Sequence, residues 1–216
     1  MLSAMTPSRP RLILASTSRY RRELLARLGL PFEAMAPPYD EERGKAELSH
    51  LDPEALSLAL GRGKARSIAA LHRDAIVIGS DQIAVLEGAR LDKPGTHERA
   101  CAQLSRLAGR THRLVTSVVV IDARSGLERE HVDVHELTMR SLGGTQIAAY
   151  VARDAPLDCA GSYRMESLGV ALFDRVRGDD ATAIVGLPLV AVTRMLVAMG
   201  LDPLEPHEGR SQGSSS

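Results

Sequence analysis

The stretch Leu12-Ile-Leu-Ala-Ser-Thr-Ser-Arg-Tyr-Arg-Arg22 sets the pattern for the whole chain. Its first four residues form a short apolar run, as expected of a buried strand. Ser16, Thr17 and Ser18 follow as candidate N-caps, and residues 22–28 carry apolar side chains at helical spacing. The stretch therefore predicts a strand, a polar loop and a helix in succession, which is one repeating unit of an α/β fold.

The same alternation continues along the chain. A buried strand is predicted at residues 75–78, ending at Gly79, and a polar, acidic loop at residues 37–53. Helical spacing is found in four further segments, which are residues 53–71, 96–107, 144–153 and 188–199.

Further strands are predicted in the second half of the chain. Residues 114–121 and 129–139 are expected to pair as a hairpin across the turn at residues 124–126, and residues 170–173 to form another strand. Helices interleaved with isolated and hairpin strands favour an α/β protein with a mixed sheet flanked by helices.

Length and charge restrict the class of protein. The chain has 216 residues, with 27 Lys and Arg against 27 Asp and Glu, so it is long enough for one substantial domain and carries no formal net charge. A balanced charge argues against a nucleic-acid polymer as partner but not against a small nucleotide. We expect one domain over residues 11–203, a flexible N-terminus over residues 1–10 and a disordered tail over residues 204–216.

The sequence also predicts a location. No stretch approaches the roughly 20 apolar residues of a membrane helix, and the N-terminal residues lack the apolar segment of a secretory signal. Only Cys101 and Cys159 are present, without the spacing of a zinc site or a disulfide framework. Two free, semi-buried thiols in the cytoplasm are therefore expected, with no membrane partner.

The first polar cluster is residues 16–22. Its hydroxyls, backbone N–H groups and guanidinium groups could converge on an anion at the N-terminus of a helix. The alternative is that Ser and Thr only cap the helix while the arginines lie in water. Three arginines within four residues exceed what capping requires.

The second and third clusters contain carboxylates and lysines. Asp81, directly after a predicted buried strand, could accept a proton from water or bind a divalent metal, or could simply stabilise a turn. Asp40, Glu41 and Glu42, with Lys64 and Lys93, would suit a site for metal and phosphate, because Mg²⁺ uses one or two carboxylates together with substrate phosphates. Taken singly, each is as compatible with a solvated surface charge.

Two apparent motifs do not hold. Residues 61–65 suggest a P-loop, but Leu58 replaces the leading Gly, Ala65 replaces the final Ser or Thr, and the segment lies inside a predicted helix. His131 and His135 would share one face of a strand, but no third metal ligand accompanies them. We expect them on the surface of the hairpin.

Taken in order, these segments resemble the Maf family of nucleotide pyrophosphatases. The resemblance runs from about Arg11 to Leu201 and rests on eight motifs, each weak by itself. They are Leu14-Ala-Ser-Thr-Ser-Arg-Tyr-Arg-Arg-Glu-Leu-Leu25, Tyr39-Asp-Glu41, Lys64-Ala65, Ile78-Gly-Ser-Asp-Gln82, Asp92-Lys-Pro94, Leu107-Ala-Gly-Arg-Thr-His112, Cys159-Ala-Gly-Ser162 and Ile184-Val-Gly-Leu-Pro188.

The resemblance implies a mixed α/β fold related to the inosine-triphosphate pyrophosphatases, usually dimeric. It also implies metal-dependent hydrolysis, with Mg²⁺ or Mn²⁺, of a nucleoside triphosphate to its monophosphate and pyrophosphate. In this likeness Asp81 is the catalytic base, Glu41 the acidic loop residue that holds metal, and Arg21, Lys64 and Lys93 the phosphate cations. Ser16, Thr17 and Ser18 would donate hydrogen bonds to the substrate. The residues leave open whether Asp81 is the base, a metal ligand or both.

Three residues resemble the branch of the family whose substrate is 7-methyl-GTP, namely Tyr20, Gln82 and Glu166. N7-methylguanine carries a positive charge, so an aromatic face can stack on it and a carboxylate can accept its ring N–H and amino hydrogens. The chain departs from the family at Arg19, where Pro is usual, so its loop loses a fixed φ.

Alternatives remain at this level. Tyr20 could pack against the helix, and Glu166 could pair with an arginine. The same chemistry could act on dTTP and UTP or on a broader set of noncanonical nucleotides. A different class would be a non-enzymatic nucleotide-binding regulator of septum formation, with which the family name is linked.

Overall fold

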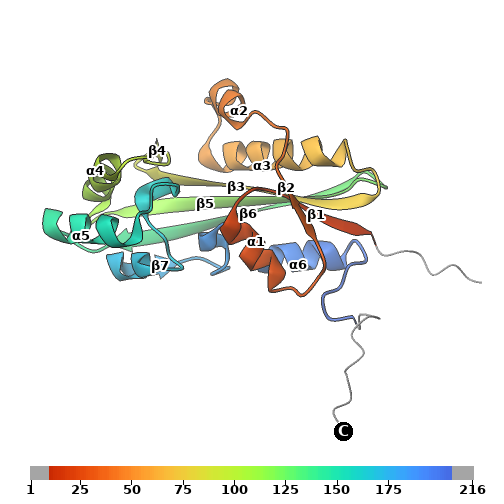
Figure 1. Ribbon diagram of the computed structural model, residues 1–216. Helices are drawn as coiled ribbons and strands as arrows, with labels where there is room; N and C mark the ends of the chain where they lie inside the picture. The colour runs from red at the N-terminus through yellow and green to blue at the C-terminus, as the bar shows by residue number, and fades with distance from the viewer. Residues whose placement is uncertain (1–9, 206–216) are drawn as a thin grey trace, which may run out of the picture.

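A mixed sheet forms the centre of the structure, a computed structural model that describes residues 10–205 (Figure 1). Within these residues seven strands pair in the order β2-β1-β3-β5-β6-β7, with β4 also beside β3. β1 is parallel to β2 and β3, and all other pairs are antiparallel, which confirms the predicted mixed sheet. The strands are β1 (Arg11–Ala15), β2 (Glu33–Met35), β3 (Ala75–Leu86), β4 (Ala89–Leu91), β5 (Thr111–Asp122), β6 (Leu127–Met139) and β7 (Phe173–Arg177).

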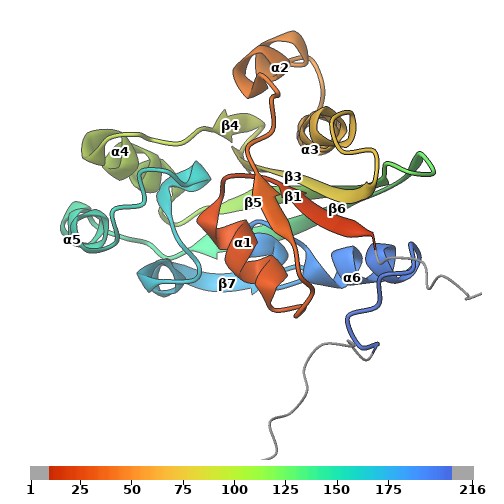
Figure 2. The same cartoon turned by 45° about the vertical axis from the view of Figure 1, so that its right-hand side comes forward.

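Helices cover both faces of this sheet. Figure 2 shows α3, together with α2, above the strands and α1 and α6 below them, while α4 and α5 lie towards one end of the sheet. The helices are α1 (Arg19–Ala26), α2 (Glu41–Glu47), α3 (Pro53–Ala69), α4 (His97–Leu107), α5 (Gly144–Asp154) and α6 (Leu189–Val197), with the 3-10 turns η1 (Ala160–Ser162), η2 (Leu168–Leu172) and η3 (Ala183–Val185). All five predicted helices and the hairpin are confirmed. No helix in residues 10–205 is long and apolar enough to cross a membrane.

The alternation of side chains along β3 explains the layers. Val77 packs with Ala65 and Ile68 of α3, whereas Ile76 and Ile78 pack against α1 and α6 on the other face. β3 is apolar on both faces because helices cover both, as in other sheets with parallel crossovers.

Backbone atoms of α3 and β3 approach closely at two glycines. A Cβ on Gly79 would lie 2.3 Å from the Gly61 carbonyl oxygen, and a Cβ on Gly61 would lie 2.9 Å from Ser117 Oγ. Ser57 adds two hydrogen bonds at the same contact, because its Oγ donates to the Asp81 carbonyl and its carbonyl accepts from Ser117 Oγ. These contacts fix the height of α3 above the strand that carries Asp81.

One edge of β3 is open in its middle. β1 pairs with residues 75–78 and β4 with residues 84–86, so among residues 10–205 the segment 79–83 has a strand partner only on the β5 side. The prediction that this strand ends at Gly79 is wrong, because β5 pairs with β3 without interruption and places Asp81 opposite Ser117. Asp81 therefore lies within a strand and not after one.

The segment predicted as a loop at residues 37–53 contains α2. Asp40 caps this helix by accepting from the Arg43 N–H, and the pairs Arg43–Glu47 and Lys45–Glu41 are four residues apart on its surface. The predicted strand at residues 170–173 is also partly wrong, because residues 168–172 form η2 and pairing starts at Phe173.

His135 is not on the hairpin surface as expected, since only 2% of it is exposed. Its Nδ1 lies 2.7 Å from Asp133 Oδ1, and Gly178 packs directly on its ring. The loop after β7 covers this face of β6, and that covering segment could not be inferred from the hairpin alone.

Cys101 and Cys159 are free and half-buried, as predicted. The predicted flexible N-terminus and disordered tail lie outside the described residues, apart from Pro10, Leu204 and Glu205.

A second buried histidine belongs to an aromatic cluster at the α4–α5 end. His112 Nε2 lies 2.9 Å from the Tyr163 hydroxyl, and the ring of Tyr163 packs edge-on against Phe173 at 4.9 Å between centroids. Burial lowers the pKa of His112 to about 4, so its ring is neutral in the folded protein at neutral pH.

Replacing Gly79 by Ala should destabilise the protein by about 2–3 kcal/mol, because the new methyl group meets backbone atoms of α3 that cannot move aside locally. Urea unfolding of the Gly79→Ala variant measures this. Gly144→Ala is the matched control: nothing lies within 4 Å of the position that its methyl group would take at the start of α5, so the free energy of unfolding should stay equal or rise slightly. Equal stability of the two variants would contradict the close contact.

Stability should also fall on acidification through His112. Between the ordinary pKa of 6.5 and the folded value of about 4, the unfolded chain binds more protons than the folded protein, so stability falls as pH falls through this window. The full loss should be about 3 kcal/mol. Urea unfolding at pH 7.5 and pH 4.5 should show a smaller difference for His112→Gln than for the wild type. His50→Gln, at an exposed position, should leave the difference unchanged; an unchanged difference in His112→Gln would contradict the prediction.

Candidate active site

A cleft of about 610 Å³ opens where the edge of β3 lacks a strand. Its walls are the loop after β1, the starts of α1 and α2, one face of α3, the segment after β4, the loop at residues 158–166 and η3. Every site residue predicted from the sequence lines this cleft, namely Ser16, Thr17, Ser18, Tyr20, Arg21, Glu41, Lys64, Asp81, Gln82, Lys93 and Glu166.

Lys64 joins two carboxylates at the floor of the cleft. Its Nζ lies 2.6 Å from Asp81 Oδ1 and 2.7 Å from Glu41 Oε2. Only 7% of Lys64 and 4% of Asp81 are exposed, so both charges are largely removed from water. The close packing of α3 on β3 sets this geometry, because Lys64 is one turn along α3 from Gly61.

The two carboxylates differ in their electrostatic surroundings. Burial opposes ionisation of Glu41, but Lys64 and Lys45 outweigh it and lower its pKa to about 2. Burial dominates at Asp81 and raises its pKa, although Lys64 and Arg21 act in the opposite direction. Glu41 is thus a permanent anion, while Asp81 is held closer to the pH at which it can exchange a proton.

Asp81 has one oxygen without a partner. Its Oδ1 accepts from Lys64, whereas Oδ2 is buried and has no hydrogen-bond partner among the described residues. A buried, unsatisfied carboxylate oxygen is costly unless a ligand, water or ion completes it. Oδ2 is therefore the atom of this carboxylate that a ligand, a water molecule or an ion can reach without breaking an existing bond.

The loop after β1 prepares a site for an anion at the start of α1. Ser18 caps the helix by accepting from the Arg21 N–H, and Ser16 Oγ accepts from the Ser18 N–H at 3.1 Å. The Arg21 side chain turns back towards this loop, where its Nε donates to the Gly186 carbonyl at 2.9 Å and its Nη1 reaches Ser16 Oγ. Burial lowers the pKa of Arg21, against the effect of Asp81 and Glu41, and an arginine still stays charged.

Gln82 lines the cleft, but its amide nitrogen is bonded within the protein. Its Nε2 donates to Thr116 Oγ1 and to the carbonyls of Ala183 and Ile184. Ser80, on the same face of β3, donates to the Gly186 carbonyl at 3.0 Å. Gln82 and Ser80 thereby hold η3 and Gly186 against the open part of β3, and Gly186 in turn holds Arg21.

Tyr20 lines the cleft and lies close to two cations. The guanidinium carbon of Arg19 is 5.1 Å from the ring centroid and that of Arg164 is 6.0 Å away. The ring therefore already binds positive charge on its face, as stacking on a cationic base would require.

Glu166 stands near Tyr20 without pairing with an arginine in the described part of the chain. Arg164 instead pairs with Asp158 at 3.1 Å. Partial burial raises the pKa of Glu166, with Arg164 acting against the shift. The carboxylate is thus available for donors on a ligand.

Lys93 is less closely integrated than the other predicted residues. It lines the cleft but is exposed, and no ion pair joins it to Asp81 or Glu41 within residues 10–205. Three contributors were missed from the sequence: Lys45, Arg164 and the Gly186 carbonyl. Lys45 could have been found as the residue four positions after Glu41, but the carbonyl of Gly186 has no side-chain signal.

The donors fit a divalent ion only in part. Within residues 10–205 no group of three or more His, Cys, Asp or Glu side chains is placed to hold a metal ion. The free Oδ2 of Asp81 could accept a cation, whereas both Glu41 oxygens are already bound by Lys64 and Lys45. Such a set suits Mg²⁺ or Mn²⁺ that takes its remaining ligands from phosphates and water.

Comparison with known proteins supports the resemblance seen in the motifs. The chain is 49% identical over 199 residues to a 7-methyl-GTP pyrophosphatase of Bordetella pertussis, covering 92% of this chain and 96% of that one. It is 46% identical over 200 residues to a 7-methyl-GTP pyrophosphatase of Thiobacillus denitrificans, covering 93% and 98%. The family model described as Maf-like protein matches residues 11–199, and the chain therefore belongs to the Maf family.

Proposed function

We propose that this protein is a nucleoside triphosphate pyrophosphatase that hydrolyses 7-methyl-GTP to 7-methyl-GMP and pyrophosphate. The observation that carries the chemistry is the free Oδ2 of the buried Asp81, next to Lys64 and Arg21 in one cleft. The relatives named 7-methyl-GTP pyrophosphatase, similar along nearly their full length, support the substrate.

In the proposed reaction a water molecule attacks the α-phosphorus and loses its proton to Asp81 Oδ2. The raised pKa of this carboxyl favours the role, because a general base works best when its pKa is near the working pH. The bond from the α-phosphorus to the bridging oxygen breaks, and pyrophosphate leaves with that oxygen. Asp81 Oδ1 stays on Lys64, which keeps the carboxylate in one orientation.

The cationic side chains of the cleft would stabilise the negative charge of the substrate phosphates. Arg21 is fixed by Gly186 and Lys64 by two carboxylates, so both are oriented before the substrate binds. Ser16, Thr17 and Ser18 would donate hydrogen bonds from the start of α1. Lys93, on the exposed side, would contact the outer phosphates.

A divalent metal ion is part of the proposal. Glu41 would hold it together with phosphate oxygens once Lys45 or Lys64 releases one of the two Glu41 oxygens, and Asp81 Oδ2 is the carboxylate oxygen that no described residue binds. When bound, the ion would offset negative charge on the triphosphate and on the leaving pyrophosphate. One free oxygen cannot serve as proton acceptor and metal ligand at once, and the raised pKa favours the first role for Asp81.

The methylated base would lie against Tyr20, with Glu166 accepting its ring N–H and amino hydrogens. The base would take the place of Arg19 or Arg164 over the ring, and both are long side chains that are at least partly exposed. The same catalytic groups would serve dTTP or UTP, so Tyr20 and Glu166 would determine which base is selected.

A regulator that only binds nucleotides would not need a buried carboxylate with one oxygen that lacks a hydrogen-bond partner among the described residues. The expected homodimer and cytoplasmic location remain predictions.

Asp81→Asn should reduce pyrophosphate release from 7-methyl-GTP by about 100-fold or more, because Asn keeps the size of Asp81 but cannot accept the proton. Initial rates with Mg²⁺ or Mn²⁺, and their loss with EDTA, measure this. Asp122→Asn is the control: Asp122 is a buried acid paired with Arg124 at the far end of β5, and its variant should keep activity near the wild-type value. Wild-type release by Asp81→Asn would overturn the assignment.

Tyr20→Ala should lower kcat/KM for 7-methyl-GTP by about 2-fold to 30-fold, the range of a cation–π contact. The values for dTTP and UTP should change little, and Tyr20→Phe should retain most of the preference because it keeps the ring. Measuring all variants on the same panel of nucleotides tests this. An equal loss on every substrate would show that Tyr20 shapes the loop and does not select the base.

A further inference from the structure

A second, smaller groove of about 360 Å³ opens beside the main cleft. It is formed by the end of β4 with the segment after it and by one face of α4. Residues 90–93 line both hollows, so the groove continues from the part of the cleft where the outer phosphates are expected. Apart from Lys93, its residues have no role in the proposed reaction.

The groove is strongly basic. Arg90, Lys93, Arg99 and Arg106 line it, against the single carboxylate of Asp92. Arg99 and Arg106 are seven residues apart on α4, two helical turns, and therefore project from the same face. No ion pair joins any of the four cations to a carboxylate in the described part of the chain, whereas Arg62 and Arg66, for example, both pair with Glu128.

The frame that carries these cations is fixed. Gln103 Nε2 donates to the Asp92 carbonyl at 2.7 Å, and its Oε1 accepts from Ser162 Oγ at 2.6 Å. Behind them Leu91 and Leu104 belong to the buried core. The groove is therefore held open by the fold, and the spacing between its two walls does not depend on a bound ligand.

We propose that this basic groove, made of Arg90, Lys93, Arg99 and Arg106, is a second binding site for inorganic pyrophosphate. The inference rests on the proposed function, in which pyrophosphate is released into the adjoining part of the cleft. Four unpaired cations in one hollow concentrate positive potential and favour a compact polyanion. None of the described residues that line the groove is aromatic, so they offer no surface for stacking a base, and this favours free pyrophosphate over a second nucleotide.

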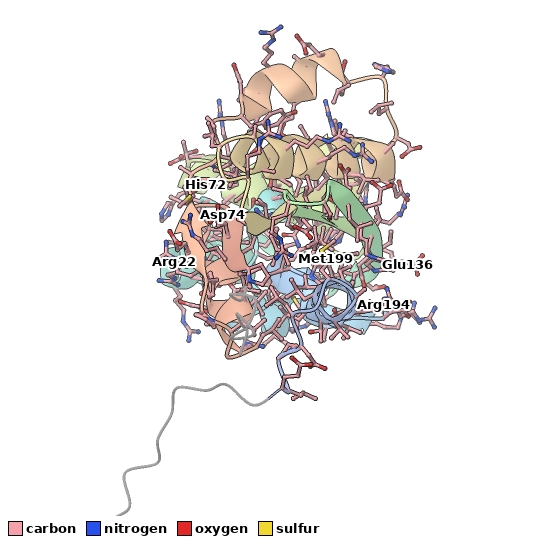
Figure 3. All side chains as sticks on the ribbon, turned by 90° about the vertical axis from the view of Figure 1, so that its right-hand side faces the viewer. Arg22, His72, Asp74, Glu136, Arg194 and Met199 are labelled. Carbon is pink, nitrogen blue, oxygen red and sulfur yellow. The ribbon has the colours of Figure 1, made fainter. Side chains whose placement is uncertain are left out.

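Isothermal titration of the full-length protein with inorganic pyrophosphate tests the site. Arg99→Gln with Arg106→Gln should weaken groove binding about tenfold, since each exposed cation contributes a modest amount. Arg27→Gln with Arg194→Gln is the matched control, because both arginines are exposed, line neither hollow and form no ion pair within residues 10–205; Figure 3 shows Arg194 extending outwards from α6. This control should bind as the wild type does.

Arg21→Gln separates the groove from the main cleft. Binding in the groove should persist in this variant, and thermal unfolding of all variants checks that they are folded. Unchanged pyrophosphate binding by the Arg99 and Arg106 double variant, or loss of all binding in Arg21→Gln, would overturn the proposal. Because the titration involves no turnover, failure to hydrolyse 7-methyl-GTP would count against the proposed function and not against the groove.

Discussion

The open edge of β3 between Ile78 and Ala84 is the constraint around which the molecule is organised. A strand edge without a neighbour exposes backbone groups, and most folds cover or avoid such an edge. Here β1 ends and turns into α1, β4 begins to pair only from Ala84 onwards, and the space between them becomes the cleft. The side chains of residues 80–82 meet groups from distant parts of the chain at this opening.

Most charged side chains on the floor of the cleft are paired with one another in the protein without substrate. Three ion pairs link four side chains in the order Lys45, Glu41, Lys64 and Asp81, so that positive and negative charges alternate. Such a chain keeps buried charges tolerable, since each is compensated by a neighbour, yet it leaves one carboxylate oxygen unused. The zero net charge of the protein is thus compatible with local fields of both signs: this paired set on the floor and the unpaired arginines of the basic groove outside it.

Much of the fold followed from periodicity alone, because strongly amphipathic segments such as residues 97–107 and apolar runs such as residues 75–78 leave few choices. The errors arose where contacts distant in sequence decide the outcome. Asp81 lies inside β3 because β5 extends the pairing, and His135 is buried because a loop more than 40 residues later covers it. α2 was missed since its helix depends on capping and ion pairs and has no apolar stripe.

The residues of the site could likewise be predicted from the sequence, but the contacts between them could not. The eight motifs, taken in sequence order, identified side chains that line the cleft. No pattern indicated that Gln82 would donate a hydrogen bond to η3, or that Lys64 would form ion pairs with both Glu41 and Asp81.

The bond from Arg21 to Gly186 spans 165 positions of the chain. During synthesis the N-terminal segment with Arg21 emerges long before η3, and domains complete their long-range contacts only when the chain is long enough. A nascent or truncated chain would already carry Asp81 and Lys64 but would lack the carbonyl that orients the arginine. The orientation of Arg21 seen in the folded protein therefore depends on a residue made much later than Arg21 itself, and a chain that stops before Gly186 cannot hold the guanidinium in this way.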